Sequence, residues 1–266
     1  MFSKKIKLTL QKFHWILYTQ FGFDPRILIR SIFSVPSYLK NYLLFKKNFS
    51  GKINFLPCLQ DHYEESGATK NEYFWQDLFV AQTIFKNNPI KHVDIGSRVD
   101  GFVAHIASFR DCEVFDVRPN STAIPGIRFH KANVMDKSSL PYSIEGYCDS
   151  VSCLHALEHF GLGRYGDPIN PKGYLHGLEN ISQLLKPNGT FYLSTPIGQE
   201  RVEFNANWVF DPKKLIQFAF SLHLHLEHFY LIKSHGIEVI KITDEILTEL
   251  RNRPYELGLF LFKKKI

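Results

Sequence analysis

The sequence predicts an α/β protein built on a doubly wound, mostly parallel sheet with an antiparallel edge. Short apolar runs alternate with helix-like segments from residue 70 onward, a glycine turn follows the first run, and hairpin-like pieces close the chain. A seven-stranded sheet is expected, with the strand-like runs near the end of the chain forming its antiparallel edge. Of the 266 residues, 44% are hydrophobic, which is enough to fill the core of such a domain.

The predicted strands are apolar runs that end at turn residues or acids. The first two run up to Asp94 and Asp116, and the third covers residues 128–136. The later strand-like runs lie at 148–153, 190–195, 224–232, 237–242 and 257–264. A Pro-Asn-Gly turn at 187–189 marks the start of the fifth strand.

Between these runs, apolar residues recur with the spacing of one helix face. The predicted helices cover residues 70–86, 99–109, 174–185, 212–220 and 243–251. Strand, turn, helix and strand therefore follow one another in the order that a parallel sheet needs.

Charge divides the chain unevenly. Residues 1–52 contain ten of the 32 Lys and Arg residues and a single acid, Asp24, whereas the rest of the chain has 22 basic and 25 acidic residues. We therefore predict a basic helical extension over 1–53 and one larger domain over 54–266.

The extension is expected to form three short amphipathic helices. Gly22 ends the first, the pair Asp24-Pro25 is a typical helix start, and Pro36 separates the second from the third. The apolar faces have two possible roles that the sequence leaves open: packing on the larger domain, or docking on an anionic membrane surface. Nucleic acid is not an expected partner, because no binding module accompanies the basic residues.

The four cysteines show no paired spacing, which is typical of reduced, structural residues. No apolar run reaches the ~18 residues of a membrane span, and the N-terminus lacks a secretion signal. We expect a cytoplasmic protein, at the inner face of the membrane if the basic extension docks there.

The turn after the first strand is the most informative motif. Asp94, Gly96 and Ser97 end that strand, and Asp116 ends the second about 20 residues on. Glycine allows close approach of a ligand, and an acid at this spacing accepts ribose hydroxyls. Only Gly101 follows Gly96, so the three-glycine turn of dinucleotide sites is absent, which disfavours a nicotinamide cofactor. S-Adenosylmethionine, which has a ribose but no phosphates, fits better; a turn serving only chain reversal is the alternative.

Taken in order, five motifs resemble those of the S-adenosylmethionine-dependent methyltransferases with the Rossmann-like fold. They are VDIGS, the acid of VFDVRP, ANVMD, CDSVSCLHALEHF and LLKPNGTFYLSTP, and the resemblance covers about residues 70–265. More narrowly, DIGSRVDGFVAH and LEHFGLGRYGDPI resemble an uncharacterised methyltransferase-like domain family whose bacterial members accompany surface-polysaccharide genes. The resemblance implies a sugar, sugar-nucleotide or glycan substrate, and a membrane-bound precursor or glycosyltransferase as a possible contact of residues 1–52.

The resemblance also implies site residues. The positions that match cofactor-binding motifs are Asp94, Gly96, Ser97, Gly101, Asp116, Asn133 and Val134. Asp116 matches the ribose-binding acid, and Asn133 and Val134 begin the loop that contacts adenine.

The candidate catalytic residues are His155, Glu158 and His159, which follow the fourth strand. Methyl transfer requires alignment of the acceptor and a base for the departing proton, and an imidazole suits that role. His155 is the first choice because it lies nearest the strand end. The same letters spell an inverted zinc-protease pattern, but His155 adjoins a strand rather than a helix, and we expect no metal.

Two loops are candidates for substrate binding, because long loops at strand ends tend to bind ligands. The first contains Arg164, Tyr165 and Asp167, of which the arginine suits an anionic group. The second contains Asn205 and Trp208, which suit a sugar. We predict O-methylation of a sugar or glycan precursor; a catalytically inactive binding or scaffold protein is the alternative.

Overall fold

The computed structural model describes residues 2–140 and 145–265, which form two compact units. Unit 1 covers Met1–Ala68 and unit 2 covers Thr69–Ile266. In the described part of the chain, no helix has both the length and the apolar character needed to cross a membrane.

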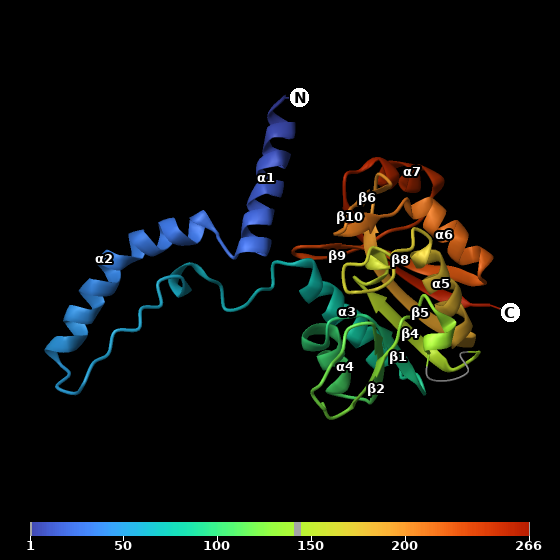
Figure 1. The fold of residues 1–266 in the computed structure, drawn as a ribbon, viewed down its shortest axis with the longest axis horizontal. Coiled ribbons are helices and arrows are strands. Elements are labelled where there is room, and N and C mark those ends of the chain that lie inside the picture. The colour runs from blue at the N-terminus through green and yellow to red at the C-terminus, as the bar shows by residue number, and fades with distance from the viewer. Residues whose placement is uncertain (1, 141–144, 266) are drawn as a thin grey trace. The chain divides into compact units, whose positions relative to one another are not determined.

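Unit 1 contains two helices, α1 (Phe2–Phe21) and α2 (Pro25–Lys47). The side chain of Asp24 caps α2 by accepting a hydrogen bond from the backbone N–H of Arg26. The prediction of three helices is wrong, because Pro36 lies inside α2. A proline removes one backbone hydrogen bond, and here the helix continues on both sides of it. A segment with one 3₁₀ turn, η1 (Asp61–Tyr63), then runs back along α2 (Figure 1).

Unit 2 is built on an eight-stranded sheet with the order β3-β2-β1-β4-β5-β10-β8-β9, counted over the described residues (Figure 1). The strands are β1 (His92–Ile95), β2 (Cys112–Asp116), β3 (Ile127–Lys131), β4 (Cys148–Leu154), β5 (Leu185–Ile197), β8 (Leu224–Lys233), β9 (Gly236–Val239) and β10 (Glu256–Lys264). The first five are parallel, and β10, which lies between β5 and β8, is antiparallel to both. The predicted α/β class with a mostly parallel sheet is confirmed.

Helices cover both faces of this sheet. On one face, α3 (Glu72–Asn87) and α4 (Ala104–Ala107) share a core with side chains of β2, β4, β5, β8 and β10. On the other lie α5 (Gly173–Leu184), α6 (Pro212–Ser221) and α7 (Asp244–Asn252). Each face has its own core of buried apolar side chains, as expected for a doubly wound sheet.

Four predicted elements differ from those observed. β5 begins at Leu185, so the Pro-Asn-Gly turn at 187–189 lies inside this strand and does not mark its start. The short piece after Gly236 joins the sheet as β9, so the sheet has eight strands rather than seven. The third strand ends at Lys131 instead of residue 136. The helix predicted over 99–109 is instead a π-helical turn, η2 (Val99–Val103), followed by the short α4. Gly101 interrupts the helix with φ −122° and ψ −109°, which are not helical angles.

A small antiparallel hairpin lies outside the main sheet. It pairs β6 (Arg201–Glu203) with β7 (Asn207–Val209) and follows β5 directly. Two further 3₁₀ turns, η3 (Lys137–Ser139) and η4 (Leu157–His159), follow β3 and β4. The hairpin and η4 bring polar groups to the edge where the parallel strands end.

Candidate functional site

The carboxyl ends of the parallel strands meet at one edge of the sheet. Because β1 pairs in parallel with β2 and β4, and β4 with β5, the residues that follow these strands lie on the same side. They are Gly96 after β1, Asp116 at the end of β2 and His155 after β4. Ligands of open α/β sheets bind at this edge.

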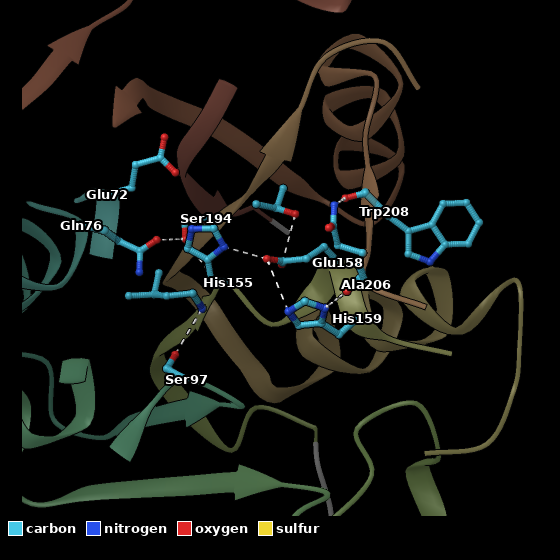
Figure 2. A network of polar contacts seen from close by, with 12 residues as sticks. Glu72, Gln76, Ser97, His155, Glu158, His159, Ser194, Ala206 and Trp208 are labelled. Carbon is cyan, nitrogen blue, oxygen red and sulfur yellow. Dashed lines mark hydrogen bonds and ion pairs between the residues drawn. The ribbon is translucent and has the colours of Figure 1, made fainter. Parts of the chain in front are cut away.

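A histidine and a glutamate form the centre of the site (Figure 2). The Nδ1 atom of His155 lies 2.8 Å from Oε1 of Glu158, and the Glu158 side chain is only 1% exposed. Burial raises the pKa of the Glu158 carboxyl, but the hydrogen bond from His155 and the positive charge that His155 and His159 carry when protonated outweigh burial, so its pKa is lowered. The carboxylate is therefore ionised at neutral pH.

An ionised carboxylate only accepts hydrogen bonds, so Nδ1 of His155 carries the proton in the neutral ring. The lone pair then lies on Nε2. This atom is buried and has no hydrogen-bonding partner among the described residues. Buried polar atoms in proteins are almost always paired, so an unpaired nitrogen at a strand end indicates a ligand position.

The backbone of His155 supports the same conclusion. Its φ of 51° is in the left-handed region, which a non-glycine residue adopts at a cost of about 1 kcal/mol or more. Its N–H donates to the Ser194 carbonyl of β5 at 3.1 Å, which holds it in this conformation. The ring of Tyr73, from α3, lies against the imidazole with centroids 4.5 Å apart.

The second histidine faces the hairpin. Nδ1 of His159 donates to the carbonyl of Ala206 at 2.7 Å, and its Nε2 lies 3.9 Å from Oε1 of Glu158 (Figure 2). Burial lowers the pKa of His159, so the ring is neutral at pH 7. The His159 ring therefore lies between the β6–β7 turn, to which it is hydrogen-bonded through Nδ1, and the Glu158 carboxylate.

A chain of contacts joins these residues to the acid at the end of β2. The Arg164 guanidinium donates to the Ala206 carbonyl at 2.8 Å and lies 5.2 Å from the centre of the Tyr165 ring. Arg118 lies 4.6 Å from the same ring and donates hydrogen bonds to both carboxylate oxygens of Asp116. These contacts thus bring His159, Arg164, Tyr165 and Asp116 together in one site.

Two predicted cofactor residues lie beneath the surface. The Asp94 carboxylate accepts hydrogen bonds from the N–H and Oγ of Ser97 and from Oγ of Ser152, at 2.6–3.0 Å. Burial raises the pKa of Asp94 to about 7. Asp94 and Ser97 therefore fix the turn after β1 from below.

The turn itself depends on glycine. Gly96 has φ 70°, and a Cβ built on it would lie 3.0 Å from Cβ of Ala156. A Cβ on Gly101 would lie 2.9 Å from Oδ2 of Asp77, a buried acid of α3. Gly96 is thus required by its left-handed backbone and the close approach of Ala156, whereas Gly101 leaves room for the end of the Asp77 side chain.

The remaining predicted residues serve their own loops. Oδ1 of Asn133 accepts the N–H of Met135, and the adjacent Val134 is buried, with its carbonyl bonded to Asn180. The Asp167 carboxylate accepts the N–H groups of Gly161, Gly163 and Tyr165 at 3.0–3.2 Å.

In the second loop, Asn205 is exposed at the tip of the hairpin. Trp208 packs with Tyr174 and Phe210, at ring-centroid distances of 5.2 and 6.3 Å. Trp208 therefore anchors the hairpin on α5, and its indole nitrogen has no partner among the described residues.

Sequence reasoning missed Tyr73, Gln76, Arg118 and Ser194. Gln76 accepts a hydrogen bond from the hydroxyl of Ser194, directly behind the His155 ring (Figure 2). The aromatic start of α3 at Tyr73 and the arginine two positions after Asp116 were the available signals. Neither carries a recognised motif.

The residues present fit an adenosine-bearing cofactor. The Asp116 carboxylate lies at the strand end where a ribose would be bound, and Gly96 keeps the neighbouring backbone free of a side chain. One adjustment is required: Arg118 must yield the hydrogen bonds that it makes to Asp116. For metals, residues 2–140 and 145–265 contain no cluster of three or more His, Cys, Asp or Glu side chains arranged to hold an ion.

Comparison with known proteins gives one family and a set of solved structures. Residues 129–239 match a family described as "Caenorhabditis protein of unknown function, DUF268". No curated protein matches. The match covers the site histidines and both candidate substrate loops.

The solved structures include the [4+2]-cyclase SpnF, at a TM-score of 0.50 and 10% identity, covering 71% of this chain and 81% of that one. Another is the 1,6-didemethyltoxoflavin N1-methyltransferase of Burkholderia thailandensis with bound S-adenosylhomocysteine (TM-score 0.47, 13% identity, 72% and 79% covered). A third is the N-methyltransferase NodS of Bradyrhizobium japonicum (0.47, 10%, 72% and 97%). At these identities the similarity is one of fold, so the reaction must be argued from the site.

Proposed function

We propose that this protein is an S-adenosylmethionine-dependent methyltransferase in which His155 accepts the proton of the group that is methylated. The observation that carries the proposal is the buried, unpartnered Nε2 of His155, held by Glu158 in the tautomer that accepts a proton. A base positioned in this way contributes about 10²- to 10⁴-fold to a rate. The resemblance of the sequence motifs points to the same reaction.

The cofactor would be held at the ends of β1, β2 and β3. Asp116 would accept the ribose hydroxyls, the turn at Gly96 would face the methionine part, and Asn133 would adjoin the adenine. When bound, S-adenosylmethionine supplies the methyl group. The chain's own part is to align the acceptor hydroxyl and take its proton on Nε2 of His155, while Glu158 stabilises the resulting imidazolium.

The acceptor that suits this site best is a hydroxyl on an anionic sugar or sugar nucleotide. Arg164 has no carboxylate partner in the described part of the chain, and its guanidinium lies beside Tyr165 and near His159. An arginine free of acids can bind a carboxylate or phosphate through paired hydrogen bonds. The proposal includes a role of this O-methylation in surface-polysaccharide biosynthesis, which the resemblance implies, and a cytoplasmic location.

One observation favours a second candidate, a non-catalytic binding module. Arg118 donates to both oxygens of Asp116, so the acid that a ribose needs is already paired. A domain that has lost its cofactor could retain such a pair permanently. The two candidate functions therefore differ in whether the Arg118–Asp116 ion pair separates when the cofactor is added.

Isothermal titration with S-adenosylmethionine and S-adenosylhomocysteine tests the proposal. We expect the wild type to bind both ligands and Asp116→Ala to bind at least about tenfold more weakly, because a charge-assisted hydrogen bond is lost. Arg118→Ala should bind up to about fivefold more tightly, since a half-exposed ion pair no longer competes.

Arg128→Ala is the matched control, because Arg128 pairs with Glu113 and does not contact Asp116. Its affinity should equal that of the wild type. Binding by Arg118→Ala alone would mean that the pair blocks an intact site. If neither the wild type nor Arg118→Ala binds either ligand, the proposal is wrong and the non-catalytic module is favoured.

A further inference from the structure

Helix α2 in unit 1 carries an apolar face that no described residue of the same unit covers. Leu28, Ile32, Leu39 and Leu43 are 53%, 61%, 47% and 59% exposed. Their spacing of four, seven and four residues places them on one side of the helix. No described residue of α2 is buried.

The adjacent side of α2 is covered by the unit's own returning segment. Phe55 contacts the rings of Tyr38 and Tyr42, and Gln60 donates to the hydroxyl of Ser31. The hydroxyl of Tyr63 accepts a hydrogen bond from the hydroxyl of Ser34. The segment thus packs on the polar and tyrosine side and leaves the leucine and isoleucine side open.

Unpaired positive charge accompanies this open face. Lys40, Lys46 and Lys47 line the same groove as Pro36, Leu39 and Leu43. These lysines have no carboxylate partner among the residues the structure describes. The single acid of residues 1–52, Asp24, is already bound by Arg26 and His14. The complementary negative charge must therefore come from outside the unit.

We propose that α2 lies on an anionic membrane surface. Leu28, Ile32, Leu39 and Leu43 enter the boundary between headgroups and acyl chains, and the lysines contact lipid phosphates. Apolar residues flanked by lysines on a single helix side suit a continuous, charged, deformable surface of this kind. This inference is independent of the proposed methyl transfer.

Co-sedimentation of the full chain with vesicles tests the proposal. One set contains equal parts of phosphatidylserine and phosphatidylcholine, and the other phosphatidylcholine alone. We expect binding to the anionic vesicles only. Ile32→Ser/Leu43→Ser should weaken it at least about tenfold, because two apolar side chains no longer leave water. Lys40→Gln/Lys47→Gln should also weaken binding to the anionic vesicles, because each lysine that contacts lipid phosphates contributes up to about tenfold to the affinity.

The matched control is Ile90→Ser/Val239→Ser, which removes two aliphatic side chains of equal or greater exposure from unit 2. It should bind as the wild type does, and circular dichroism should show unchanged helix content in every variant. Three results would overturn the proposal: equal binding to neutral vesicles, no binding to either set, or an α2 variant that binds normally. A dimer in light scattering that Ile32→Ser/Leu43→Ser dissociates would assign the face to a second copy instead.

Discussion

Glu158 holds two imidazoles from one buried position. Its Oε1 atom lies 2.8 Å from Nδ1 of His155 and 3.9 Å from Nε2 of His159, while Thr195 donates to Oε2 at 3.4 Å. The short contact fixes which nitrogen of His155 is free to accept a proton. The role of His155 therefore depends on the charge of its neighbour as much as on its own chemistry.

Replacing Glu158 with Gln should remove the preference of the neutral His155 ring for a proton on Nδ1. In the wild type, ¹⁵N NMR of the histidine rings should show His155 protonated at Nδ1 alone when the ring is neutral. Glu158→Gln should give a mixture of tautomers, because an amide can donate as well as accept. Any methyl transfer should fall by about 100-fold or more.

Thr195→Val is the matched control, because it removes only the long hydrogen bond to Oε2. Its His155 signals should keep the wild-type tautomer. Superimposable His155 signals in Glu158→Gln and wild type would contradict the assignment.

The loop between η4 and α5 is organised by its own acid. Asp167 accepts three backbone N–H groups, and Gly161, with φ 77°, lies so close to Asn170 that a Cβ would come within 1.9 Å of its carbonyl oxygen. The loop that carries Arg164 and Tyr165 thus has a defined conformation held by its own hydrogen bonds. An irregular segment of this kind opens locally when its few hydrogen bonds are lost.

Asp167→Ala should loosen the loop without unfolding the domain. Hydrogen exchange at the N–H groups of Gly161, Gly163 and Tyr165 should accelerate by about tenfold or more, since each loses a bond to a charged group. Mass spectrometry of peptides across the loop measures this. Asp136→Ala, which removes a comparable cap at η3, should affect only residues near Ser138. Unchanged exchange in Asp167→Ala would show that the glycines alone hold the loop.

Sequence patterns predicted most elements because each depends on local chemistry. Alternating apolar runs, Asp211 before α6 and Thr243 before α7 mark elements that the structure confirms. Two errors concern residues whose usual effect on a helix is not the one observed. Pro36 reads as a helix end but lies within α2, and Gly101 reads as part of a helix but has non-helical φ and ψ.

The site could be predicted only where strand ends define it. Asp116, His155 and Glu158 follow parallel strands, so topology alone brings them to one edge. Arg118 and Tyr73 could not be foreseen, because their roles depend on which side chains they meet across elements. The burial of Asp94 and Ser97 is likewise a consequence of packing between β1 and β4.

Beneath the site, the two central strands share a buried polar cluster. Asp94 of β1 and Ser152 of β4 are hydrogen-bonded, and His92 lies between Ser150 and Ser152 at 2.8 and 3.1 Å. Burial lowers the pKa of His92 to about 3, so this ring is neutral. The stability of the whole domain is therefore coupled to the protonation of Asp94.

Asp94 should make the domain less stable as pH rises. Its pKa is about 7 in the folded chain, against an ordinary 3.8, so between these values the folded chain retains a proton that the unfolded chain has released. The free energy of unfolding must then fall as pH rises through this window, by at most ~1.4 kcal/mol per pH unit for one proton. Urea unfolding at pH 5 and pH 8 should show the wild type losing stability relative to Asp94→Asn, which cannot ionise. Asp100→Asn is the control, because it removes the same charge at an exposed position where Arg98 lowers the pKa. Its free energy of unfolding should change between pH 5 and pH 8 by the same amount as that of the wild type. A constant difference between wild type and Asp94→Asn would mean that Asp94 is ionised throughout and that its serine partners fully compensate burial.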